Sequence, residues 1–275
     1  MKRPRVGHIQ FLNCLPLYYG LVKTDMVLDM ELVKGAPRDL AAMLLEGELD
    51  VAPIPSIEYA RHSEGLVLLP DISISSEGAV QSILLLSKSP VEDLDDKVVA
   101  LSDTSRTSQV LTRILFAKHW EREPIFVEMP PDLPEMMRDA SAALLIGDVA
   151  LRAFHERHDL LTYDLGRVWD EFTGLPMVYA VWAARREWAE GDPDGALRLV
   201  RALGASNRYS HEHLDAISEY AARWEPMPPG FFRDYFDSLR FSFDERCRAG
   251  MARFFSEAHS IGQLDRVPEI RVFGG

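Results

Sequence analysis

The chain has 275 residues, of which 47% are hydrophobic, and a formal net charge of −13. This length and composition suffice for one large domain or two smaller lobes, and they exclude a disordered or fibrous protein. The acidic charge argues against a broad nucleic-acid footprint and against binding to an anionic membrane.

The N-terminal stretch predicts no export signal. Polar residues at His8, Gln10 and Asn13 interrupt any apolar core after the basic start, so we expect a cytoplasmic protein. The longest apolar runs are far shorter than the roughly 20 residues that a membrane span needs. The cysteines Cys14 and Cys247 match no zinc or redox spacing, and we expect two free thiols and no bound metal.

Extended and helical patterns alternate from the start of the chain. Strands are predicted over residues 4–12, 27–35 and 49–56, with a helix over residues 36–48 before the last of them. Strand, helix and strand in this order predict a right-handed crossover and a parallel sheet. Ligands collect at the carboxyl ends of such strands, and Asn13 and Ser56 follow two of the apolar runs.

A change in composition marks a second lobe. Two long extended stretches end in a polar, acidic run at residues 91–97, and a second series of strands and helices begins there. The apolar run at residues 173–185 predicts the return crossing. We therefore expect an α/β protein with two lobes joined by two extended crossing segments, residues 1–88 and 177–275 forming lobe 1 and residues 89–176 forming lobe 2.

The C-terminal third is predicted to be mainly helical. In its last helix, Ser242 and Glu245 have the spacing of a capping box. The helical repeat places one apolar face on Cys247, Met251, Phe254, Phe255 and Ala258. Two lobes with a polar cleft between them suggest a clamp that closes on a small ligand.

A hydroxyl-rich turn at residues 101–111 is the first candidate site. If a helix begins near Ser105, its free N–H groups and the hydroxyls of Ser105, Thr107 and Ser108 can bind a carboxylate or phosphate. Arg106 is the basic residue within the turn. The alternative is that Ser105 is a simple N-cap and the other hydroxyls are solvated.

Four further residues are candidates for the cleft. Asn13 can orient a hydroxylated ligand, although an asparagine in a turn often serves its own backbone. Ser82, inside an apolar crossing strand, must find a partner or face the cleft. Ser56 and Asp148 end strands in the two lobes, with turn or helix-cap roles as the alternative.

Several ordered motifs resemble one enzyme family. They are HIQFLNCLPLYYGL, GELDVAPIPSIEY, GAVQSILLLS, LSDTSRTSQVL, LIGD and DLGRVWDEFTGLPMVYAVWA. In this order they resemble chorismate dehydratases of the futalosine route to menaquinone, over roughly residues 5 to 260. The resemblance implies a type II periplasmic-binding-protein-like fold and the conversion of chorismate, a dianion, to 3-[(1-carboxyvinyl)oxy]benzoate and water, without a cofactor.

The same resemblance implies roles for individual residues. Asn13 and Ser82 lie nearest the reacting centre, and a substrate carboxylate is the expected base. The substrate-binding set is Ser56, Ser105, Arg106, Thr107, Ser108, Gly147 and Asp148. The related 1,4-dihydroxy-6-naphthoate synthases are the first alternative, but their opening motif differs and they use a histidine base in the second lobe. The second alternative is a non-catalytic protein of the same fold that binds small anions.

Overall fold

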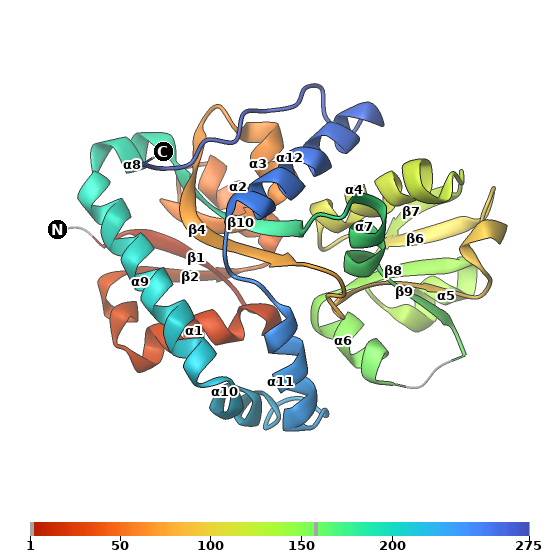
Figure 1. Ribbon diagram of the computed structural model, residues 1–275, viewed down its shortest axis with the longest axis horizontal. Coiled ribbons are helices and arrows are strands. Elements are labelled where there is room, and N and C mark those ends of the chain that lie inside the picture. Colours follow the sequence, from red (N-terminus) through yellow and green to blue (C-terminus); the bar gives the residue numbers. More distant parts are fainter. Residues whose placement is uncertain (1–2, 157–158, 275) are drawn as a thin grey trace.

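The computed structural model describes residues 3–156 and 159–274. Its strands form two five-stranded sheets that lie side by side along the long axis of the molecule (Figure 1). We call each sheet, with the helices that pack on it, one half of the protein. The predicted α/β architecture is confirmed.

The first sheet combines strands from both ends of the chain. In pairing order its strands are β2 (Glu31–Gly35), β1 (Arg5–Ile9), β3 (Val51–Pro55), β10 (Met177–Arg185) and β4 (Leu66–Ser76). β1 is parallel to β2 and β3, and β10 runs antiparallel between β3 and β4. All five residues of β3 are buried, as expected for a strand covered on both faces. The strand predicted over residues 27–35 begins later, because Met26–Asp29 form a 3₁₀ turn.

The second sheet repeats this arrangement with strands from the middle of the chain. In pairing order they are β7 (Ile125–Met129), β6 (Val98–Ser102), β8 (Ala142–Ile146), β5 (Ile83–Ser87) and β9 (Leu161–Asp164). β6 is parallel to β7 and β8, while β5 runs antiparallel to β8 and β9.

Helices or 3₁₀ turns follow most strands of both sheets. In the first half they are the 3₁₀ turn η1 (Leu12–Cys14), α1 (Leu15–Lys23), α2 (Pro37–Leu45) and α3 (Ser56–His62). In the second half they are the 3₁₀ turn at Val91–Asp93, α4 (Arg106–Leu115), α5 (Leu133–Asp139), α6 (Gly147–His155) and α7 (Leu165–Thr173). A π-helical turn at Phe116–Trp120 continues α4. The remaining helices are α8 (Arg186–Gly191), α9 (Pro193–Glu212), α10 (Leu214–Ala221), α11 (Pro229–Ser238) and α12 (Glu245–Ser260).

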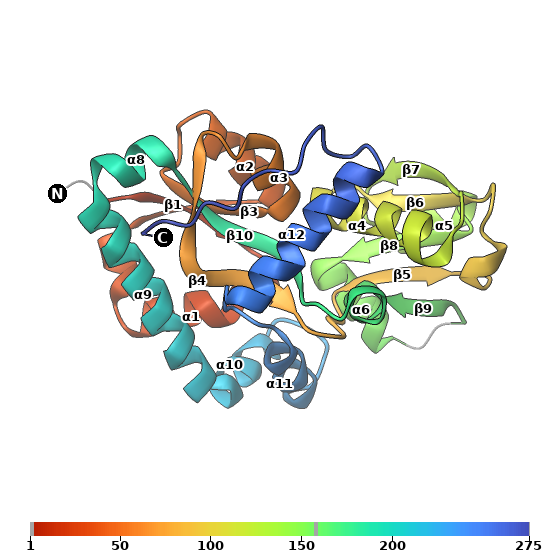
Figure 2. The same cartoon turned by 45° about the horizontal axis from the view of Figure 1, so that its top comes forward.

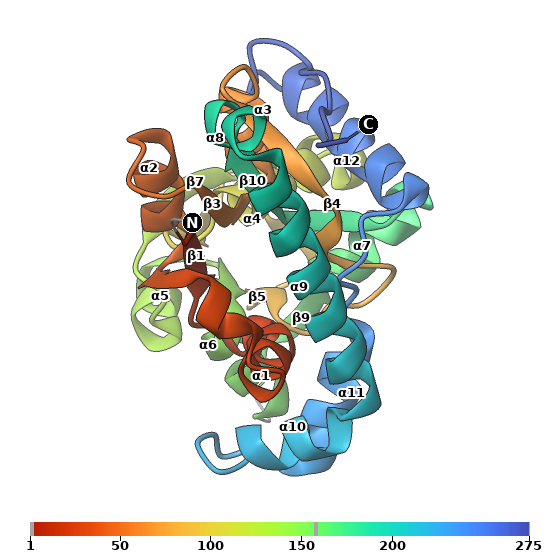
Figure 3. The same ribbon diagram turned by 90° about the vertical axis from the view of Figure 1, so that its left-hand side faces the viewer.

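Two long C-terminal helices pack differently, and one of them bridges the halves. α9 packs along α1 and β4 of the first sheet (Figure 3), whereas α12 crosses the junction and contacts α3, α4 and β10 (Figure 2). The predicted apolar face of α12 is confirmed, because all five of its residues are fully buried. The capping box is wrong: Asp244 is the N-cap and accepts a hydrogen bond from the Cys247 N–H, so Ser242 lies outside the helix.

The chain passes between the sheets at residues 77–82 and again at residues 174–176. The predicted boundary after residue 88 therefore conflicts with the strand pairing, since β5 already belongs to the second sheet. The acidic run at residues 91–97 marks an exposed connection after β5 rather than the crossing itself. Among the described residues, no helix combines the length and apolar character required to span a bilayer.

Candidate functional site

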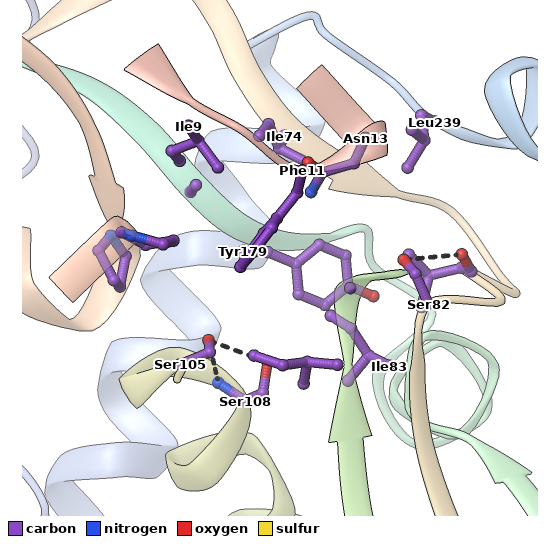
Figure 4. A pocket seen from close by; sticks show the side chains of 16 residues that line it. Ile9, Phe11, Asn13, Ile74, Ser82, Ile83, Ser105, Ser108, Tyr179 and Leu239 are labelled. Atoms are coloured by element: carbon purple, nitrogen blue, oxygen red, sulfur yellow. Dashed lines mark hydrogen bonds between the residues drawn. The ribbon is translucent and has the colours of Figure 1, made fainter. Parts of the chain in front are cut away.

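A cavity between the two sheets draws its lining from both halves (Figure 4). Most of the lining is apolar, from Ile9, Phe11, Pro37, Pro55, Ile74, Val80, Ile83, Ile146, Ala180 and Leu239. The rest is Asn13, Ser82, Ser105, Ser108, Tyr179 and Gly147. Among the described residues, no charged side chain lines it. An apolar cavity with a few polar groups is typical of a site for a small molecule.

Asn13 and Ser82 both face this cavity. Asn13 lies in η1, which begins three residues after the last residue of β1, and its buried amide oxygen makes no hydrogen bond with any residue that the structure describes. Ser82 lies in the crossing segment, just before β5 rather than inside it, and its hydroxyl donates a long hydrogen bond of 3.3 Å to the Val80 carbonyl. A buried polar atom without a partner indicates a place where a ligand can bind.

The N-terminus of α4 contributes two hydroxyls. Ser105 is the N-cap, as predicted, and its hydroxyl accepts from the Ser108 N–H at 3.4 Å. The two hydroxyl oxygens are 3.2 Å apart, so one hydroxyl hydrogen serves this contact and the other is available to an anion. Ser108 is 1% exposed and Thr107 is fully buried, which excludes the alternative that these hydroxyls are solvated.

Ser56 and Thr107 lie outside the lining and meet each other between the halves. The Ser56 hydroxyl donates to the Val178 carbonyl at 2.8 Å, and its oxygen lies 3.4 Å from the Thr107 hydroxyl. Thr107 also accepts from the Ile57 N–H at 3.3 Å. These hydroxyls are therefore engaged with protein groups, and the structure does not bring them to the cavity.

Arg106 also points away from the cavity. Its guanidinium donates to Glu128 at 2.8 Å and to Gln109 at 3.0 Å. The predicted anion-binding site at the N-terminus of α4 therefore consists of hydroxyls and free backbone N–H groups, whereas the arginine of this turn forms an ion pair with Glu128.

Gly147 and Asp148 divide between two cavities. Gly147 lines the one described above, whereas Asp148 lines a second cavity, which shares Ile9 and Phe11 with the first. One Asp148 carboxylate oxygen accepts from the Leu12 N–H at 3.0 Å. Burial raises the pKa of Asp148 to about 6, because it disfavours the charged form.

Three residues of this region were not predicted. Phe11 lines both cavities, and Tyr179 lines the first one with its hydroxyl 2.9 Å from that of Ser76. The buried Tyr235 hydroxyl has no hydrogen-bond partner within residues 3–156 and 159–274. Burial raises its pKa, and the neighbouring Ser82 hydroxyl acts in the opposite direction. Phe11 lies near the end of the strand predicted over residues 4–12, two residues before Asn13, which is a usable signal. Nothing in the helical pattern distinguishes Tyr235 from a core residue.

Known structures share this architecture. A crystal structure of a protein from Archaeoglobus fulgidus superposes with a TM-score of 0.79 at 19% identity, covering 95% of this chain and 98% of that one. The periplasmic aliphatic sulphonate binding protein SsuA from Escherichia coli superposes with a TM-score of 0.70 at 13% identity, covering 98% and 91%. The predicted periplasmic-binding-protein-like fold is confirmed.

Sequence comparison is more specific. Chorismate dehydratase of Thermus thermophilus is 31% identical over 268 residues, which are 92% of this chain and 94% of that protein. The 1,4-dihydroxy-6-naphtoate synthase of the same organism is 26% identical over 275 residues, or 95% and 96%. A family model described as menaquinone biosynthesis matches residues 4–260. The chain therefore belongs to the menaquinone biosynthesis family, and these two relatives are enzymes.

Proposed function

We propose that this protein is a chorismate dehydratase, which converts chorismate to 3-[(1-carboxyvinyl)oxy]benzoate and water. The observation that carries the proposal is the apolar cavity whose lining includes both Ser82 and Asn13, the latter with a buried amide oxygen that has no hydrogen-bond partner among the described residues. The 31% identity to a chorismate dehydratase over nearly the whole chain supports it.

The reaction places modest demands on the protein. The ring carbon that carries the enolpyruvyl ether loses a proton, and the electron pair of that C–H bond forms a ring double bond. Hydroxide leaves the adjacent carbon and combines with the proton as water. Because the product ring is aromatic, the protein mainly has to hold a reactive geometry and stabilise developing charge.

The cavity lining fits a reaction in which the substrate supplies the base. Among the described residues, the lining contains no aspartate, glutamate or histidine. In the proposal, the enolpyruvyl carboxylate of chorismate takes the ring proton while Asn13 and Ser82 orient the reacting groups. Ser105 and Ser108, at the N-terminus of α4, would bind a carboxylate through the available hydroxyl hydrogen and the helix dipole.

The related synthase activity is the second candidate, because one such enzyme matches 95% of the chain. The resemblance implies a histidine base in the second half for that activity. The described part of the cavity lining offers none, which favours the dehydratase.

Purified protein incubated with chorismate, without added metal or cofactor, tests the proposal. We expect 3-[(1-carboxyvinyl)oxy]benzoate by chromatography and mass spectrometry, and its loss in folded Asn13→Ala and Ser82→Ala variants. Asn207→Ala, a change in α9 outside the cavity, is the control and should leave the rate unchanged. Unchanged chorismate would contradict the proposal: tight binding without turnover would favour a binding protein, and no binding would favour the synthase.

A further inference from the structure

Two adjacent residues at the start of α6 contact the backbone beside the two candidate catalytic residues, Asn13 and Ser82. The Gly147 N–H donates to the Ser82 carbonyl at 2.8 Å. The next residue, Asp148, accepts from the N–H of Leu12, which directly precedes Asn13. One dipeptide of the second half therefore touches the backbone on which each candidate catalytic side chain is mounted.

Local geometry explains how this dipeptide reaches across. Gly147 has φ +65°, a left-handed conformation that suits glycine and lets β8 turn directly into α6. Asp148 lies in the first turn of α6, where a carboxylate is favourable beside the helix N-terminus. Its oxygen nevertheless bonds to Leu12 in the other half.

The contact also completes the local structure around Asn13. The turn η1 begins after Phe11, whose side chain cannot cap it. The N–H of Leu12 is therefore one of the free donors that every helical start leaves. Asp148 satisfies this donor from the opposite half, so the conformation of η1 depends on the two halves being together.

The carboxylate of Asp148 is largely buried, and burial disfavours its charged form. The charged and titratable groups that act on it are Arg152 of its own helix, Glu225 beyond α10, Cys14 of η1 and Tyr235 of α11. Arg152 is engaged with Glu225 through two hydrogen bonds of 2.8 and 2.9 Å. The hydrogen bond that Asp148 accepts is the one from the backbone of η1, at 3.0 Å, although burying a carboxylate costs free energy.

We propose that Asp148 is a positioning residue, which caps η1 from the opposite half and thereby fixes the amide of Asn13 at the cavity, rather than a ligand of the substrate. The inference rests on the proposed function for its effect on catalysis. It makes a distinct claim about structure: closing the two halves and orienting Asn13 are one event.

A pair of variants separates positioning from substrate binding. Asp148→Ala removes the acceptor, and we expect kcat to fall about 10- to 100-fold, since small misplacements of reacting groups have effects of this size. KM should change by less than about threefold. Asp148→Asn keeps an oxygen acceptor of the same shape, so its kcat should stay within about threefold of wild type. Asp139→Ala, at an exposed carboxylate ending α5, is the control.

Hydrogen exchange measured by mass spectrometry provides a readout that needs no turnover. In Asp148→Ala the peptide covering η1 should exchange at least about tenfold faster than in wild type, and in Asp148→Asn it should not. Equal exchange in all three proteins, or equal damage by both substitutions, would overturn the inference. If wild type leaves chorismate unchanged, the proposed function fails, and the exchange experiment still decides whether Asp148 positions η1.

Discussion

The two sheets share one strand order and one set of strand directions, but the polar groups at their equivalent ends behave differently. In each sheet one strand lies parallel to its two neighbours, and an antiparallel pair follows. The end of β1 therefore corresponds to the end of β6, and the end of β3 to the end of β8. The contacts between the halves join these ends crosswise.

One crossed contact joins Leu12, after β1, to Asp148, after β8. The other joins Thr107, after β6, to Ser56, after β3. The second uses neutral hydroxyls and ends on a backbone carbonyl, away from the cavity. The first uses a titratable group beside Asn13. The same architecture thus supplies one contact that joins the halves away from the cavity, and a second contact that we propose positions Asn13.

The largest expected effect separates Asn13 from Ser56. Asn13→Ala should lower kcat/KM for chorismate by about 100- to 1,000-fold, as removal of an oriented polar group from an active site does. Ser56→Ala should lower kcat/KM less than about tenfold, because the Ser56 hydroxyl is hydrogen-bonded to the Val178 carbonyl and lies next to the Thr107 hydroxyl, outside the cavity lining. Steady-state kinetics on both variants checks this, and a greater loss in Ser56→Ala would reverse the comparison.

The next effect is a pH dependence of stability that Asp148 contributes and the hydroxyl contact does not. The folded protein holds the Asp148 proton up to about pH 6, whereas the ordinary pKa is 3.8. The contribution of Asp148 to the stability of the folded state therefore decreases as pH rises through this window. The free energy of unfolding of Asp148→Asn should exceed that of wild type by about 1 to 3 kcal/mol at pH 8 and should nearly equal it at pH 4. Urea unfolding at both pH values measures it; a constant difference would refute the assignment.

The hydroxyl contact should show no such dependence. Thr107→Val keeps the shape of the side chain but leaves the Ile57 N–H without its acceptor, so we expect a loss of about 1 to 2 kcal/mol in unfolding free energy. The loss should be the same at pH 5 and pH 8. A loss that changed with pH would show that the two crossed contacts are coupled.

The smallest effect concerns Tyr235. Because its buried hydroxyl has no partner in the described structure, Tyr235→Phe should leave the unfolding free energy unchanged or raise it by up to about 1 kcal/mol. Calorimetry can detect this. Destabilisation beyond about 1 kcal/mol would mean that the hydroxyl has a hydrogen-bond partner, and the neighbouring Ser82 hydroxyl would be the first candidate.

Local patterns predicted the elements well and their partners poorly. Alternation and helical periodicity located β1, β3 and the buried face of α12, because burial repeats with the geometry of the element. They misassigned β5, since the sheet that an antiparallel strand joins depends on distant residues. The hydroxyls around α4 were found as a group, but Thr107 turns to Ser56, 51 residues away, which no local pattern records.

The order of the strands also affects how the protein can be made. The second sheet is continuous in the chain, from residue 83 to residue 164, whereas the first needs β10 to be inserted between β3 and β4. During synthesis on the ribosome, β3 and β4 therefore each keep one edge unpaired until residue 185, the last residue of β10, has emerged. The half that begins the chain is the last to be completed, and the interval exposes two apolar strands that a chaperone would have reason to cover.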